Sequence, residues 1–328
     1  MNNMNNINNM NNMNNMNNMN SIIMVGFNSD YAQLDVIGLS QKYDVYHLSM
    51  PAFLISLLIL IKDRVKWLFT FICQSYFKFK LATIQGKMVL VCDDNVISVE
   101  ALQLSCKAIS RKILILRNTY KPELIEINLK DIDYYSFDVG DCNKYGFLEY
   151  SQYCSGFDYI CKNKGKRKSK CVDFYFLGLN KGRRNILNVL EKKLSNYTTK
   201  IDIKERPTGF KKLSNRICKE DKYQHVGYCS HLDNILACNV VIDIVKEGQS
   251  GLTMRAIEAI LAGKKIITNN KNIKNEPFYN AKNIMVIDED ANINTKEIDC
   301  FMNNDAVDFD ESVLNNYSVV NVFQSILN

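Results

Sequence analysis

Residues 240–270 read VVIDIVKEGQSGLTMRAIEAILAGKKIITNN, and this stretch decides the fold. Its apolar, β-branched start, Val240–Val245, is typical of a strand buried inside a parallel sheet. A polar loop with two glycines follows, and the spacing then predicts a helix over 253–262. Gly263 stands where a left-handed helix cap is needed, and the next strand is expected over 264–268. Strand, loop, helix and strand in this order predict a doubly wound α/β domain.

The loop of this unit suits a bound phosphate group. Glycines between a strand and a helix let a ligand approach the backbone closely. The unpaired amides and the dipole at a helix N-terminus then attract negative charge. Ser250, Gly251 and Thr253 are therefore predicted to lie beside the diphosphate of a nucleotide. Glu258 lies farther along the helix, where its carboxylate is expected to meet sugar hydroxyls.

Simpler structural roles are open for the same side chains. Serine, glycine and threonine before a helix are common as turn and cap residues. Glu258 and Arg255 stand three residues apart on the expected helix, a spacing that also suits a surface ion pair. Arg255 is thus a candidate both for this pairing and for phosphate binding.

Four motifs extend from this loop toward the C-terminus. They are GQSGLTMRAIEA (248–259), GKKIIT (263–268), FYN (278–280) and Asn283-Ile284. Together they resemble the C-terminal half of bacterial lipopolysaccharide and capsular polysaccharide biosynthesis glycosyltransferases, over roughly residues 172–290. The resemblance implies an α/β, GT-B fold with two Rossmann-like domains facing a central cleft. The second domain would hold most of the sugar nucleotide, and the final helix, 319–327 here, often returns to the first domain.

The resemblance also bears on individual residues. Many GT-B enzymes carry two glutamates separated by seven residues, but Ser250 stands at the first of these positions and Glu247 lies three residues too early. The resemblance therefore implies a contact with the donor for Glu258, and this role cannot be carried over to Glu247.

A second strand, glycine loop and helix begin at Val172. The strand is expected over 172–178, a basic loop follows, and a helix continues to about Leu194. In the resembling family the equivalent loop faces the diphosphate, so Lys181 and Arg183 would offset the charge of the leaving group. The alternative is an exposed basic loop, although cations at a helix N-terminus oppose the dipole unless an anion is present.

The N-terminal half resembles the family only in its layout. Its strands are expected over 21–26, 43–48, 87–92, 112–116 and 134–137, with a helix over 98–109. This alternation predicts a Rossmann-like, acceptor-side domain over 21–157. A basic linker is expected over 158–171, and the nucleotide-sugar-binding domain over 172–328. Residues 1–20 are an Asn-rich repeat and are predicted to be a disordered tail.

An inverting transferase needs a carboxylate or a histidine that takes the proton of the acceptor hydroxyl. Such a base is expected at the carboxyl ends of the first domain's strands. Asp30 follows the first strand, and Asp93 and Asp94 follow the third, so these three are candidates by position. Cap and turn roles are the alternative, and a retaining enzyme needs no such base.

An apolar stretch in the first domain has two open interpretations. Pro51–Ile61 is too short to cross a bilayer, which needs about 20 apolar residues. Continued to Ile72 with basic residues interspersed, it predicts either a long helix lying on a membrane or a buried helix of the domain.

Composition limits the classes of partner and cofactor. The chain has 328 residues, a net charge of +6 and eleven scattered cysteines with only three histidines. No Cys-x-x-Cys pair occurs, which argues against a zinc site and favours a reducing, cytoplasmic location. Three Asp-x-Asp strings (131–133, 288–290 and 308–310) match a spacing that holds a cation in another glycosyltransferase fold. Since basic side chains are available for the leaving group, no metal or other cofactor is expected to be obligatory.

The predicted function is transfer of a sugar from a nucleotide-sugar donor to a cell-surface glycan precursor of lipopolysaccharide, O-antigen or capsule. The expected partners are the nucleotide sugar and a lipid-linked or glycan acceptor. An anionic membrane surface is a further candidate partner, with a peripheral location on the inner face of the cytoplasmic membrane, and nucleic acid is not expected. The alternatives are a sugar-nucleotide epimerase and a non-catalytic GT-B-like interaction protein, which the missing first glutamate favours.

Overall fold

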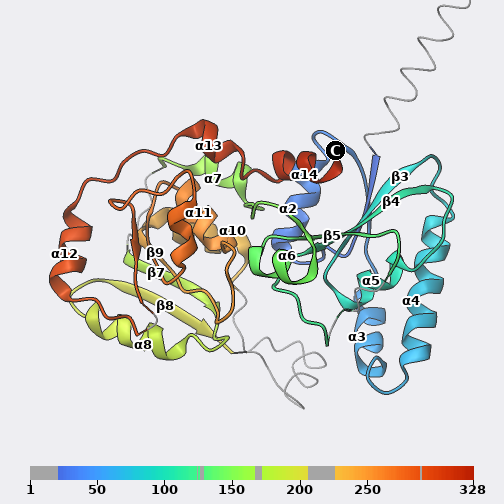
Figure 1. Ribbon diagram of the computed structural model, residues 1–328, viewed down its shortest axis with the longest axis horizontal. Helices are drawn as coiled ribbons and strands as arrows, with labels where there is room; N and C mark the ends of the chain where they lie inside the picture. The colour runs from blue at the N-terminus through green and yellow to red at the C-terminus, as the bar shows by residue number, and fades with distance from the viewer. Residues whose placement is uncertain (1–20, 124, 126–128, 167–171, 206–225, 289) are drawn as a thin grey trace, which may run out of the picture. The chain divides into compact units, whose positions relative to one another are not determined.

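The computed structural model describes residues 21–123, 125, 129–166, 172–205, 226–288 and 290–328 (Figure 1). The predicted disordered tail over 1–20 lies outside these residues. The chain divides into two compact units, each with its own parallel β-sheet. Unit 1 is the chain up to Tyr150 together with Phe323–Asn328, and unit 2 is Ser151–Val322. Two α/β units with parallel sheets agree with the predicted fold class.

Unit 1 is built on a six-stranded parallel sheet in the order β2-β1-β3-β4-β5-β6. The strands are β1 (Ser21–Val25), β2 (Asp44–Leu48), β3 (Met88–Asp93), β4 (Ile109–Leu116), β5 (Asp133–Ser136) and β6 (Leu148–Glu149). The helices that begin in this part of the chain are α2 (Asp30–Leu39), α3 (Ala52–Ile61), α4 (Lys66–Leu81), α5 (Val96–Leu102) and α6 (Val139–Tyr145). The chain order of the strands reverses between β1 and β3, which is where ligands bind in open α/β sheets.

Two helices of unit 1 differ from the prediction. The helix expected over 98–109 ends at Leu102, because Ile109–Leu116 pair with β3 as a strand instead. The single helix expected from Pro51 onward is a hairpin of α3 and α4, broken after Ile61 at a charged turn. The core of unit 1 lies between these helices and the apolar residues of β1, β3 and β4.

Unit 2 has a five-stranded parallel sheet in the order β11-β10-β9-β7-β8. Its strands are β7 (Val172–Leu179), β8 (Thr199–Lys204), β9 (Cys238–Asp243), β10 (Lys265–Thr268) and β11 (Ile284–Val286). Its helices are α7 (Phe157–Asn163), α8 (Arg184–Lys193), α10 (Tyr228–Ala237), α11 (Met254–Leu261), the 3₁₀ helix η1 (Lys271–Asn275), α12 (Thr295–Asn303) and α13 (Glu311–Asn315). The strand–helix–strand unit predicted from 240–270 is therefore present as β9, α11 and β10. Gly263 takes the predicted left-handed conformation, with φ of +69°.

The boundary between the units lies earlier than the predicted linker over 158–171. Phe157–Asn163 form α7, which contacts α10 and α11 within unit 2. Ile160 is fully buried, and the Tyr159 hydroxyl donates a hydrogen bond of 3.0 Å to Asp233 on α10. The apolar side chains of α7 therefore make it part of unit 2's core, and the division falls between Tyr150 and Ser151.

The last helix, α14 (Val319–Leu327), ends in unit 1, as the resemblance implied. Phe323 is fully buried and packs edge-on against Phe27, with ring centroids 6.5 Å apart. The Arg111 guanidinium donates to the carbonyls of Ile326 and Leu327, both at 3.1 Å. These carbonyls have no partner inside their own helix, so the arginine acts as a C-terminal cap.

Candidate functional site

A pocket of about 550 Å³ opens in unit 2 at the carboxyl ends of β7, β9 and β10. Three loops line it, one after each strand. The lining residues are Lys181, Gly182, Arg183, Asn185, Ile186, Ile244, Val245, Lys246, Glu247, Gly248, Gln249, Ser250, Asn269, Asn270, Lys271 and Asn272. The volume is in the range of small-molecule sites. The structure therefore brings Lys181, Arg183 and Ser250 together at one pocket.

The pocket carries an excess of positive charge. Among the residues that the structure describes, Lys181, Arg183, Lys246 and Lys271 line it, against the single carboxylate of Glu247. Asn185 and Ile186, in the first turn of α8, lie in the same wall. A helix N-terminus and four cations in one concave site favour an anionic ligand.

Arg183 is held rigidly at the pocket wall. Its Nη1 donates to the Ile244 carbonyl and its Nη2 to the Leu179 carbonyl, both at 2.7 Å. The guanidinium also lies over the Phe176 ring, 5.6 Å from its centroid. Burial, with a smaller contribution from Arg255, lowers the pKa of Arg183 to about 10, so the side chain stays charged at neutral pH. A fixed cation of this kind needs little reorganisation when negative charge develops beside it.

Thr253 and Arg255 form a buried cluster around Asp243. The Thr253 hydroxyl donates to Asp243 at 2.6 Å and accepts from the amide of Ala256 at 3.1 Å, which makes Thr253 the N-cap of α11. Arg255 donates to Asp243 at 3.0 Å and to the Leu177 carbonyl at 2.7 Å. Arg255 therefore forms an ion pair with Asp243 and not with Glu258.

Gly251 is hydrogen-bonded to residues of the pocket lining. Its carbonyl accepts from the side chain of Asn270 at 3.1 Å, while the Ser250 carbonyl accepts from Asn272 at 3.0 Å. Asn270 and Asn272 both line the pocket, whereas Gly251, Thr253 and Arg255 do not. The asparagines after β10 therefore tie the glycine loop after β9 to its neighbour.

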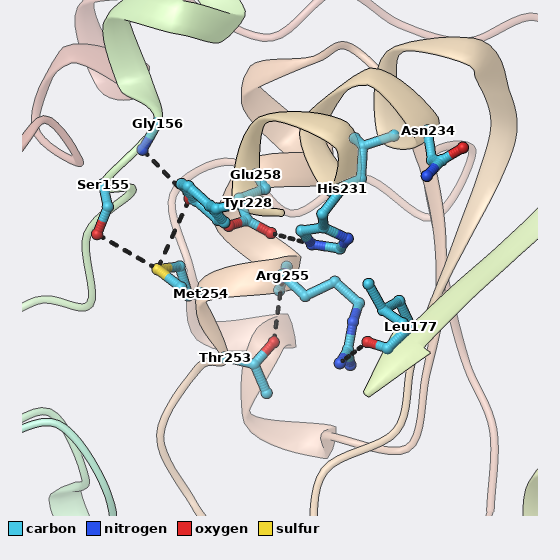
Figure 2. Close-up of polar contacts among 12 residues, drawn as sticks. Ser155, Gly156, Leu177, Tyr228, His231, Asn234, Thr253, Met254, Arg255 and Glu258 are labelled. Atoms are coloured by element: carbon cyan, nitrogen blue, oxygen red, sulfur yellow. Dashed lines mark hydrogen bonds and ion pairs between the residues drawn. The ribbon is translucent and has the colours of Figure 1, made fainter. Parts of the chain in front are cut away.

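Glu258 lies beside Tyr228 and His231 in the interior of unit 2 (Figure 2) and is not part of the pocket lining. Its side chain is 1% exposed, and both carboxylate oxygens are taken. Tyr228 donates to one at 2.5 Å and His231 Nε2 to the other at 3.0 Å. The predicted contact between Glu258 and donor sugar hydroxyls is not what this arrangement provides, because the carboxylate is enclosed by protein groups.

The charge state of Glu258 follows from these partners. Burial on its own raises the pKa of the carboxyl group, but the charge and hydrogen bond of His231 and the hydrogen bond of Tyr228 outweigh it. The pKa of Glu258 is therefore lowered. The tyrosine also accepts from the Gly156 amide at 3.2 Å, and His231 Nδ1 lies 2.9 Å from the Tyr175 hydroxyl. This network fixes α11 to α10, to β7 and to the start of α7.

The three candidate bases lie at the carboxyl edge of the unit 1 sheet or just beyond it. Asp30 is exposed at the first position of α2. Asp93 accepts from the Phe27 amide at 2.9 Å, and Asp94 accepts from the Asn118 amide at 3.1 Å. Burial raises the pKa of Asp94 in spite of the hydrogen bonds from Asn118. A raised pKa favours the protonated form of a carboxyl group, which suits Asp94 to proton exchange.

His47 at the end of β2 is a further titratable side chain at this edge, and it was not predicted from the sequence. Its Nε2 lies 2.7 Å from the Gly26 carbonyl, and because a carbonyl only accepts, Nε2 carries the proton. That tautomer leaves Nδ1 as a proton acceptor at the same sheet edge. The signal available in the sequence was a lone histidine near the end of a predicted strand.

The tight turn after β1 predicts a large effect on stability. Gly26 has φ of +91°, and a Cβ there would overlap Asp93 Oδ1 and Ser98 Oγ. Gly26→Ala is expected to lower the free energy of unfolding by about 3 kcal/mol, from left-handed strain and overpacking together. Gly146→Ala is the control, because Gly146 has φ of +72° with nothing within 4 Å of the added atom. Equal losses in urea denaturation would contradict the overlap.

Several solved structures are similar to this chain over most of its length. An α-glucosyltransferase solved with UDP and a DNA 13-mer has a TM-score of 0.56 at 9% identity, over 93% of this chain and 98% of that one. HepE from Anabaena, solved with UDP and glucose, has a TM-score of 0.54 at 11% identity, over 93% and 97%. The UDP-GlcNAc 2-epimerase of Methanocaldococcus jannaschii, solved with UDP-GlcNAc and UDP, has a TM-score of 0.51 at 14% identity, over 94% and 98%.

The chain has the GT-B fold. Each alignment covers nearly all of both proteins, so it includes the two parallel-sheet units. No protein-family model matches the chain, and no curated protein sequence does either. GT-B proteins of this similarity include both transferases and epimerases. Within the described ranges, no three His, Cys, Asp or Glu side chains gather as metal ligands.

Proposed function

We propose that this GT-B protein is a glycosyltransferase that binds a nucleotide-sugar donor in the pocket of unit 2. The observation that carries the proposal is the convergence of four cations and the first turn of α8 at the carboxyl edge of the sheet. A diphosphate carries the charge that such a site neutralises. The neighbours HepE and the α-glucosyltransferase, both solved with UDP, support a nucleoside diphosphate as the ligand.

The reaction would break the bond between the sugar's anomeric carbon and the diphosphate oxygen, and join that carbon to an acceptor hydroxyl oxygen. The electron pair of the broken bond leaves with the diphosphate, where Lys181, Arg183 and Lys271 would offset its charge. An inverting reaction also needs a base that takes the hydroxyl proton, and Asp94 and His47 are candidates for it by their chemistry. Asp30 and Asp93 remain candidates by position.

The network around Glu258 has a positioning role in this proposal. It holds α11 against the sheet, so that the loop before the helix, with Ser250, keeps its place at the pocket. Because basic side chains are available for the leaving group, the transfer is proposed to need no divalent metal.

The sequence motifs of unit 2 also bear on the acceptor and on the cellular location of the reaction. The motifs over 248–268 resemble enzymes of lipopolysaccharide and capsule biosynthesis. We propose a lipid-linked glycan precursor as the acceptor, and the cytoplasmic face of the membrane as the location.

A sugar-nucleotide epimerase is the second candidate. The M. jannaschii UDP-GlcNAc 2-epimerase shares the fold over 94% of this chain, which favours this alternative. An epimerase converts its nucleotide sugar without an acceptor, whereas a transferase consumes donor in proportion to acceptor. Incubating the purified protein with UDP-GlcNAc alone, and following the sugar by NMR, separates the two activities.

The donor site itself is tested by binding. We expect one of UDP, GDP, CDP, TDP or CMP to raise the melting temperature without Mg²⁺, since binding at 100 times Kd adds about 2.7 kcal/mol to stability. UDP is the nucleotide expected from the neighbours. No shift with any of the five nucleotides, with or without Mg²⁺, would remove the pocket as a donor site.

A further inference from the structure

The α3–α4 hairpin of unit 1 presents a large apolar surface to solvent. The two helices pack side by side (Figure 1). Phe53, Trp67, Phe71 and Phe79 are 75%, 71%, 63% and 70% exposed, and Leu57 and Leu60 of α3 are also exposed. Single exposed apolar residues are ordinary, but several aromatic ones on adjoining helices mark an interaction surface.

The outer face of α4 is distinct from its packing face. Phe69, Cys73, Phe77 and Leu81 follow one another every four residues and are buried in the core of unit 1. Trp67 and Phe71 are also four residues apart and lie on a different, exposed side of the helix. The helix is thus apolar on two faces, and only one of them is used by the fold.

α4 is fixed firmly enough to serve as a platform. Glu100 on α5 accepts hydrogen bonds from Thr70 and Gln74, both at 3.2 Å. The Tyr76 hydroxyl donates to the Ser49 carbonyl at 2.8 Å. Because these contacts and the buried stripe hold the inner face, the exposed aromatic residues are held outward.

Basic residues border the apolar face. The hairpin carries five of them against the single acid Asp63: Lys62, Arg64, Lys66, Lys78 and Lys80. Aromatic and leucine side chains mixed with lysine and arginine are the composition of helices that lie in a membrane interface. The same basic residues attract the anionic headgroups of a bilayer.

We propose that the outer face of the α3–α4 hairpin docks the protein onto an anionic lipid bilayer, with Trp67 and Phe71 inserted at the interface. No helix within the described part of the chain is long and apolar enough to cross a membrane. The charge imbalance favours a lipid surface over a second copy of the same basic face, which would repel it.

The inner side of α3, away from the docking face, adjoins the sheet edge that carries the candidate bases. Ile55 of α3 lines a cavity of about 20 Å³ beside Gly26, Asn28 and Asn95, at the carboxyl ends of β1 and β3. Docking α3 at the interface would bring this edge close to the headgroups. Only the idea that a lipid-linked acceptor is presented there rests on the proposed function; the docking itself does not.

Trp67 provides a direct readout, because it is the chain's only tryptophan. Sucrose-loaded vesicles of phosphatidylcholine, alone or mixed equally with phosphatidylglycerol, are titrated against the full chain. We expect binding to the mixed vesicles with a blue shift of the tryptophan emission, and weaker binding at high salt.

Three variants make the test specific, with sedimentation as the measurement. Trp67→Ser/Phe71→Ser is expected to weaken vesicle binding by about tenfold or more, since each side chain loses its burial in the interface. Lys78→Glu/Lys80→Glu should weaken it only for anionic vesicles. Ile37→Ser is the control, because Ile37 is 59% exposed on α2, outside the hairpin.

Two results of the vesicle assay would overturn the proposal. One is the absence of binding to either vesicle, and the other is equal binding by wild type and Trp67→Ser/Phe71→Ser. Self-association of the wild type that the double variant abolishes would assign the face to a second copy. The nucleotide-induced melting shift is measured on the same variants. This shift reports on the pocket of unit 2. If vesicle binding is lost and the shift is kept, only the docking proposal fails; if the wild type shows no shift, the donor site fails.

Discussion

Replacing Lys181 and Lys271 together with glutamine is expected to weaken nucleoside diphosphate binding by about a hundredfold. A hydrogen bond to a charged group contributes about 1.5–3 kcal/mol, and 1.4 kcal/mol corresponds to a tenfold change in affinity. Both side chains line the pocket, from the loops after β7 and β10. Glutamine keeps most of the side-chain length while removing the charge. Titration calorimetry with the nucleotide that stabilises the wild type measures the effect.

Arg184→Gln is the matched control. Arg184 lies three residues from Lys181, and its replacement by glutamine removes one positive charge. Its side chain is half-exposed, pairs with Glu205 at 2.6 Å and does not line the pocket. We expect its affinity to stay within about twofold of the wild type, because exposed ion pairs contribute little. An equal loss in Arg184→Gln would mean that net charge and not the pocket attracts the nucleotide. Unchanged affinity in the double variant would remove Lys181 and Lys271 from the site.

Glu258→Ala is expected to lower the free energy of unfolding by about 3–5 kcal/mol, because it leaves His231 and Tyr228 buried without their shared partner. The substitution also opens a cavity between α10 and α11. Urea denaturation at neutral pH measures the loss. If Glu258→Ala unfolds like the wild type but no longer binds nucleotide, the carboxylate contacts the donor directly and the positioning role is wrong.

Glu258→Gln removes the negative charge of the side chain while keeping its size and shape. The pKa of Glu258 is lowered in the folded protein from its ordinary value of 4.5, so its charge stabilises the fold fully above that value. The contribution is lost as the pH falls through the lowered folded-state pKa. The difference in stability between wild type and Glu258→Gln is therefore expected to be largest at neutral pH and to shrink below pH 4.5. A difference that grows on acidification would contradict this assignment.

Most strands of both sheets were predictable because their signals are local, whereas β6 and β8 were not predicted. The stretch 240–270 carries a β-branched run, a cap residue and a glycine at the left-handed position, and each one specifies its own piece of backbone. The basic residues Lys181 and Arg183 were found for the same reason, since they follow a strand directly. Lys246 and Lys271 also follow strands, and the same rule would have found them.

What the sequence could not predict depends on tertiary contacts. Glu258 is enclosed by Tyr228 and His231, which belong to a different helix and show no special pattern in the sequence. The basic run after Asp158 indicated a linker, whereas Ile160 and Tyr159 pack α7 into unit 2. In both cases the environment of the side chain, and not its type or spacing, decides its role.

The return of α14 to unit 1 has a consequence for biosynthesis. Phe323 completes a buried cluster with Phe27, and Arg111 caps the carbonyls of Ile326 and Leu327. During translation, β1 and β4 therefore leave the ribosome long before the segment that finishes their domain. While all of unit 2 is being synthesised, the apolar surface of unit 1 that Phe323 covers stays exposed. A gene fragment that stops at Tyr150 is thus a poor choice for expressing this domain, and one in which residues 319–328 are joined back through a short linker is the better starting point.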